Sequence, residues 1–79
     1  MRVLLFAHLK DATGLSALEI KVAGTLDADG LWNELITAQP GLARFRATTR
    51  LARNSEYATA QTRFTDSDEV ALIPPVSGG

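Results

Sequence analysis

Two almost uninterrupted apolar runs, one near each end of the chain, restrict its fold more than any other feature of the sequence. They occupy residues 3–7 and 70–73, and each has the length of a β-strand. A strand that is apolar on both faces is typical of the buried centre of a sheet. We therefore expect the two runs to be neighbouring parallel strands at the sheet centre, linked by the right-handed crossover that parallel neighbours need.

A second strand is indicated by alternation. Leu18, Ile20 and Val22 are separated by the charged residues Glu19 and Lys21, which predicts a half-exposed strand over residues 18–22. Pairing it with the first strand as a hairpin is the simplest topology. The intervening segment, residues 9–15, is expected to be a loop with one helical turn.

After Gly24 the apolar residues recur about every 3.6 positions, which predicts the principal helix over residues 25–39. Thr25 is the expected N-cap, and Pro40 follows the last turn as a helix stop. One face of this helix would consist of Ala28, Leu31, Trp32, Leu35 and Ile36. Trp32 is expected to anchor the helix to the sheet.

The second half of the chain is interpreted as short elements. Residues 41–47 favour one further turn, and strands are predicted over residues 50–53 and 56–58 around an Asn54-Ser55 turn. The acidic segment 66–69 lacks the ligand alternation and the glycine of a calcium loop, so it is interpreted as a tight turn and not as a metal site.

The resulting order, β-β-α-β-β-β, predicts an α+β fold with a mixed sheet and one principal helix packed on one face. Because one helix covers one sheet face, the other face would remain open although the first strand is apolar on both sides. We expect a partner protein to cover it. Phe6, Tyr57 and Ile73 are the candidate interface residues.

Composition excludes several classes of site. The chain has no cysteine and one histidine, which excludes disulfides, thiolate chemistry and thiolate metal sites. A formal net charge of −1 gives no general attraction to nucleic acid or to anionic membranes. The sequence has no apolar run approaching the roughly 18 residues of a membrane span and no signal-peptide pattern, so a cytoplasmic location is expected.

Half of the chain's eight Lys and Arg residues are close together, at Arg44, Arg46, Arg50 and Arg53. They lack the interleaved aromatic residues of a nucleic-acid site. A solvated face, or a docking surface for an acidic partner protein, is the better interpretation.

The sequence ends in Pro-Pro-Val-Ser-Gly-Gly, residues 74–79, after a predicted domain spanning residues 1–73. Proline rings fix φ and remove backbone N–H groups, so sheet pairing should stop here. The small residues that follow suit a narrow channel, and the α-carboxylate of Gly79, with a pKa of about 3.3 to 3.7, would be ionised and able to attack an activated phosphate. The alternative is an inert, mobile tail.

The plan of strands and helix resembles the ubiquitin-like β-grasp family, and residues 68–79 resemble the small, sulfur-carrying subunits of molybdopterin synthase. Residues 3–7 with Lys10 and Gly14, and the segment Leu51-Ala52-Arg53-Asn54, support this resemblance. Two positions depart from the family pattern. Ser67 stands where the family usually has the glycine of an Asp-Gly-Asp turn, and Arg53 stands where an apolar residue is common.

The resemblance implies that an E1-like activating enzyme joins the Gly79 carboxylate to AMP from ATP, and that a sulfur donor protein replaces AMP to give a thiocarboxylate. The tail, through Pro75, Val76, Ser77 and Gly78, would enter the large catalytic subunit of molybdopterin synthase. Sulfur would pass there to a pyranopterin precursor during molybdenum cofactor biosynthesis. No cofactor bound stably to this chain is implied, because ATP is used by the activating enzyme.

Three other interpretations remain open at this point. A sulfur carrier for thiazole or cysteine synthesis would share the fold and the final glycines. A ubiquitin-like modifier would form isopeptide bonds with lysines. A β-grasp interaction module with an inert tail would have no ATP-dependent chemistry.

Overall fold

The computed structural model describes residues 1–75 of the chain. In chain order its elements are β1 (Arg2–Leu5), α1 (Ala7–Thr13), β2 (Ala17–Glu19), β3 (Thr25–Leu26), α2 (Ala28–Ala38), the 3₁₀ helix η1 (Pro40–Phe45), β4 (Arg50–Arg53), β5 (Glu56–Tyr57), β6 (Phe64–Thr65) and β7 (Glu69–Ile73). Five of the strands form the main sheet, and β3 and β6 form a separate two-stranded ladder.

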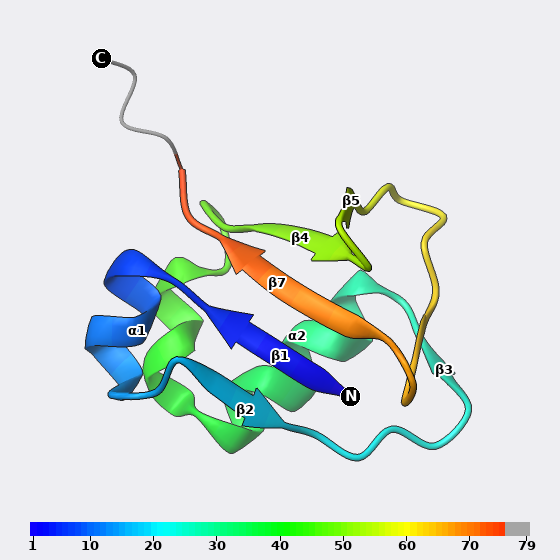
Figure 1. Ribbon diagram of the computed structural model, residues 1–79, viewed down its shortest axis with the longest axis horizontal. Helices are drawn as coiled ribbons and strands as arrows, with labels where there is room; N and C mark the ends of the chain where they lie inside the picture. Colours follow the sequence, from blue (N-terminus) through cyan, green and yellow to red (C-terminus); the bar gives the residue numbers. More distant parts are fainter. Residues whose placement is uncertain (76–79) are drawn as a thin grey trace.

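The main sheet has the order β2-β1-β7-β4-β5, so the first and last strands are neighbours at its centre (Figure 1). They are parallel, with Val3 opposite Val70 and Leu5 opposite Leu72. The β1–β2, β4–β7 and β4–β5 pairs are antiparallel. The predicted mixed sheet with central parallel strands is therefore confirmed, and so is the α+β β-grasp fold.

The helices cover one face of this sheet, and α2 runs behind the strands in Figure 1. Alternate residues of β1 and β7 point toward α2, because successive side chains of a strand leave opposite faces. The core joins strand, helix and loop residues with at most 8% exposure: Met1, Val3, Leu5, Leu9, Ile20, Leu31, Trp32, Leu35, Leu42, Leu51, Phe64, Val70 and Leu72. Trp32, at 4% exposure, is the predicted anchor of α2.

The first strand ends earlier than the predicted residue 7. Phe6 keeps extended dihedrals, but Ala7 has a φ of 48° and begins α1. This helix buries Leu9 completely and ends at Gly14, whose φ of 74° is the left-handed conformation that glycine adopts without strain. The predicted loop over residues 9–15 is thus wrong. The predicted strand 18–22 is also displaced, because β2 covers Ala17–Glu19.

The N-cap prediction at Thr25 is wrong. Thr25 belongs to β3 and pairs with Thr65, whereas Asp27 caps α2 by accepting a hydrogen bond from the Gly30 N–H at 2.8 Å. A Cβ atom at Gly30 would lie 3.1 Å from Asp27 Oδ1, so the glycine leaves room for this cap. The helix is consequently shorter than predicted, Ala28–Ala38 in place of residues 25–39.

The short elements of the second half agree better with the prediction. β4 has the predicted bounds, β5 ends one residue earlier than predicted, and Asn54 and Ser55 form the turn between them with φ values of 48° and 74°. η1 spans Pro40–Phe45, near the turn expected over residues 41–47, and buries Leu42 completely. Ser67 is not among the described residues with positive φ, so its replacement of a glycine causes no backbone strain here.

Candidate carrier strand and docking groove

The strand that precedes the predicted reactive tail is held on both sides. β7 forms four residue pairs with β1 and four with β4. It ends at Ile73, beyond which Pro74 is half-buried and Pro75 exposed. Because a central strand with two complete neighbours is among the most rigid parts of a sheet, the start of the tail has a fixed position and direction.

Within the predicted tail, residues 74–79, Pro74 and Pro75 are described. Val76, Ser77, Gly78 and Gly79 lie outside the described residues. The predicted chemical role of Gly79 and the predicted threading of the tail therefore stay predictions.

The sheet face opposite the helices has a shallow groove of about 370 Å³. It is lined by Leu4, Phe6, Ala52, Ser55, Tyr57, Glu69, Ala71 and Ile73. The strand register explains this set, because Leu4 is opposite Ala71, Ala71 opposite Ala52, and Ala52 opposite Tyr57. Ala71 on β7 and Ala52 on β4 form the floor, and the larger side chains form the walls.

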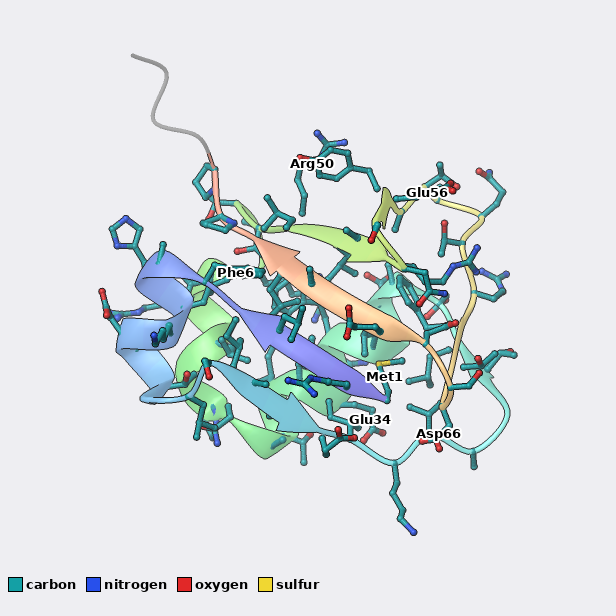
Figure 2. The ribbon with its side chains drawn as sticks, in the orientation of Figure 1. Met1, Phe6, Glu34, Arg50, Glu56 and Asp66 are labelled. Atoms are coloured by element: carbon teal, nitrogen blue, oxygen red, sulfur yellow. The ribbon has the colours of Figure 1, made fainter. Side chains whose placement is uncertain are left out.

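All three residues predicted as a partner interface line this groove. Phe6 is 45% exposed, Tyr57 is 55% exposed and Ile73 is half-buried. Figure 2 shows Phe6 between the end of β1 and the start of α1, close to the C-terminal end of β7. The structure thus brings the three side chains together, and their role in binding a partner stays a prediction.

Sequence reasoning missed the floor of the groove. Ala52 and Ala71 carried no functional signal because alanine is common in both cores and surfaces. Counting in register from the predicted outward residue Ile73 would have found Ala71, since residues two apart in a strand share a face. Ala52 needed the β4–β7 register, which the sequence does not give.

The acidic segment 66–69 forms the predicted turn at Asp66 and Ser67, and its last residue, Glu69, begins β7. The two aspartates accept hydrogen bonds from other segments of the chain. Asp66 Oδ1 accepts hydrogen bonds from the Val22 N–H at 2.9 Å and from the Met1 ammonium at 3.1 Å. Asp68 accepts bonds from the Thr65 N–H at 2.8 Å and from the Asn54 side-chain amide at 3.0 Å. These hydrogen bonds, led by the backbone ones, hold the pKa of each carboxyl below its usual value.

Within residues 1–75, no group of three or more His, Cys, Asp or Glu side chains is arranged to hold a metal ion. Over the same residues, no helix has the length and hydropathy needed to cross a membrane. The remaining departure from the family pattern, Arg53, is exposed at the end of β4 and donates a hydrogen bond to the Arg63 carbonyl at 2.7 Å.

Comparison with known proteins places these features in a family. The model of the ThiS family matches residues 3–79. A molybdopterin synthase sulfur carrier subunit from Arabidopsis thaliana is 37% identical over 79 residues, which is all of this chain and 82% of that protein. The crystal structure of SAMP1 from Haloferax volcanii has a TM-score of 0.83 and 30% identity, covering 99% of this chain and 97% of that one.

A structure from Helicobacter pylori has the same fold and is a complex of subunits 1 and 2 of molybdopterin-converting factor. The match has a TM-score of 0.68 and 24% identity, and it covers 99% of this chain and 96% of that one. With the full-length family match and the A. thaliana relative, the assignment is clear: the chain belongs to the ThiS family and groups with its molybdopterin synthase sulfur carrier subunits.

Proposed function

We propose that this chain carries sulfur for molybdopterin synthase on the carboxylate of Gly79. The observation that best supports the proposal is the placement of β7, the strand that leads into the tail, between β1 and β4 at the centre of the sheet. A rigid strand that is followed directly by two prolines would present the rest of the tail in one direction. Two glycines at its end would keep side chains away from the reacting carbon.

The proposed chemistry has two steps. A Gly79 carboxylate oxygen attacks the α-phosphorus of ATP in the activating enzyme, and pyrophosphate leaves to give an acyl-adenylate. A hydrosulfide ion released by the sulfur donor then attacks the acyl carbon, the bond from that carbon to the AMP oxygen breaks, and AMP leaves. Loss of the S–H proton to solvent gives the thiocarboxylate. This chain has no cysteine and so supplies no thiol to either step. We propose that the activating enzyme supplies the catalytic groups and binds ATP.

We further propose that the large subunit of molybdopterin synthase covers the groove between Phe6, Tyr57 and Ile73 while it receives the tail. The groove lies on the helix-free face and adjoins the end of β7, so one partner could contact the groove and the tail together. The H. pylori complex of subunits 1 and 2 supports a two-subunit assembly for a protein of this fold. The groove's apolar walls would bring burial energy to that contact.

The direct test is the intact mass of the chain after incubation with ATP, the activating enzyme and a sulfur donor. The expected product has one oxygen replaced by one sulfur, and fragmentation should locate the change at Gly79. Deleting Gly79 moves the reacting carbon back by about 3.4 Å and should abolish transfer to the large subunit, since a displacement of about 1 Å already costs on the order of a hundredfold in rate. A residue appended after Gly79 should prevent the mass change, and an unaltered mass change in that variant would refute the proposal.

A second candidate function, conjugation to other proteins, is favoured by the likeness to small archaeal modifier protein 1 of H. volcanii. Both functions begin with an activated glycine, and they differ in the attacking group. Attack by a lysine amine would give a covalent adduct with another chain, whereas attack by sulfur gives the thiocarboxylate. Denaturing electrophoresis of the same reaction separates the two outcomes.

A further inference from the structure

The four arginines that are close together in sequence have different surroundings in the structure. Arg46 forms an ion pair with Asp29 at 3.0 Å and a hydrogen bond with the Asn33 side chain at 3.2 Å. Arg53 is bound to the Arg63 carbonyl. These two guanidinium groups therefore have acceptors within the chain.

The other two arginines each stack on an aromatic ring. The Arg44 guanidinium carbon lies 4.8 Å from the centroid of Phe45, on η1. The Arg50 guanidinium carbon lies 3.9 Å from the centroid of Tyr57. Tyr57 is a wall of the docking groove and Phe45 is not, so Arg50 is the stacked arginine that stands beside the groove.

The strand register places Arg50 at a defined corner of the open face. Arg50 is opposite Ile73 in the β4–β7 ladder, so both side chains leave the helix-free face at the end of β7. Figure 2 shows Arg50 extending outward from β4, near the end of the sheet at which β7 ends. Among the described residues, no carboxylate lies within 4.0 Å of its guanidinium group.

The groove therefore has charges of opposite sign at its two ends. Arg50 stands beside one end, and Glu69, the carboxylate in the groove lining, lies toward the other end of β7. A protein that covers the groove removes water from both charges. An unpaired charge at an interface carries a large desolvation cost, which a carboxylate of the partner facing Arg50 would offset.

From this arrangement we infer that Arg50 recognises a carboxylate on the partner protein that covers the groove. The inference rests on the proposed function for the identity of that partner, the large subunit. Tyr57 holds the guanidinium plane by stacking, and the free edge of the plane can then donate two parallel hydrogen bonds to one carboxylate. Arg50 is thus a specificity-determining charge, and Phe6 and Ile73 supply apolar contact beside it.

The test compares Arg50→Glu with Arg44→Glu in the full chain, with the large subunit as binding partner. Both variants reverse the charge of an exposed arginine stacked on an aromatic ring, but only Arg50 adjoins the groove. Arg50→Glu should weaken the complex by at least about tenfold, because like charges would then face each other. Arg44→Glu should bind within about twofold of the original chain, as expected for a charge outside the interface.

A neutral variant, Arg50→Gln, tests whether charge is the cause. Raising the salt concentration should weaken the original complex more than the Arg50→Gln complex, since screening acts on the ion pair that the variant lacks. Equal affinity of Arg50→Glu and the original chain, or equal salt dependence of Arg50→Gln, would overturn the inference. If the original chain forms no complex at all, the proposed partner is wrong, and thiocarboxylation at Gly79 still tests the carrier function separately.

Discussion

Asp66 and Val22 are 44 positions apart in sequence, and the Asp66 carboxylate accepts a hydrogen bond from the Val22 N–H at 2.9 Å. The bond joins the turn before β7 to the segment between β2 and β3. The Met1 ammonium donates to the same oxygen and also to the Ile20 carbonyl, at 2.7 Å. One carboxylate thus holds three segments together at the end of the sheet where β7 begins.

This arrangement makes stability depend on pH in the acid range. The folded-state pKa values of Asp66 and Asp68 lie below 3.8, the usual value of an aspartate, so both carboxylates stabilise the fold fully above that pH. Their contribution is lost as the pH falls below about 3.8 toward the lowered values. The urea midpoint should accordingly fall as the pH is lowered from 5 to 2.

The matched variant for this prediction is Asp66→Asn. Its control is Asp11→Asn, at an exposed position of α1. Asp66→Asn should be less stable than the original chain at pH 7 and should lose less stability on acidification. Asp11→Asn should follow the original chain at every pH. An Asp66→Asn profile parallel to that of the original chain would contradict the assignment.

Trp32→Ala should destabilise the fold by about 3 to 5 kcal/mol, the usual range for removing a large buried ring. The ring is 4% exposed and packs within the core between α2 and the sheet. Leu15→Ala is the control, because Leu15 is 36% exposed and should cost little. Chemical unfolding followed by circular dichroism measures both, and similar losses for the two variants would show that Trp32 is not the anchor.

Ser55→Gly should stabilise the chain by about 0.5 to 1 kcal/mol. Ser55 has a φ of 74°, a conformation that costs a residue with a Cβ about 1 to 2 kcal/mol. Glycine has more conformational freedom in the unfolded chain, and this lowers the stabilisation by about 0.5 to 1 kcal/mol. Ser67→Gly, which restores the family's usual residue at a position without positive φ, should instead destabilise slightly. The two midpoints in urea should therefore move in opposite directions.

Phe6→Asp should abolish tight binding of the large subunit while the chain stays folded. Phe6 is the N-cap residue of α1, where aspartate is a favoured residue, so the change is compatible with the helix. Kd should rise about 30-fold or more, which corresponds to roughly 2 kcal/mol of binding free energy, as expected for an apolar anchor in an interface. Isothermal titration provides the measurement, and Leu15→Asp, an exposed residue outside the groove lining, should bind as the original chain does.

The central parallel strands could be predicted because their signal is local and strong. Val3 and Val70 belong to short runs that are apolar at nearly every position, and such runs have few alternatives in a small domain. The open face was also predictable, since one principal helix could not cover both Leu5 and Phe6. The groove itself needed the register that sets Ala52 against Ala71.

The missed elements depend on contacts that no local pattern reveals. α1 buries one residue fully, Leu9, and begins at Ala7 with a positive φ, so neither periodicity nor propensity indicated it. β3 and β6 are two residues each and pair across about half of the chain. Thr25 and Asp27 are both good N-caps in isolation, and the pairing of Thr25 with Thr65 decides between them.

The central position of β7 also affects how the protein is made. β1 is synthesised well before β7, its inner neighbour in the sheet, so the core closes only through contacts that join residues 2–5 to residues 69–72. Such long-range contacts slow folding and delay it until β7 has been synthesised. A truncated product without β7 lacks the strand that joins β1 to β4. A chain that lacks β7 should therefore not accumulate as a folded competitor for the large subunit proposed as its partner.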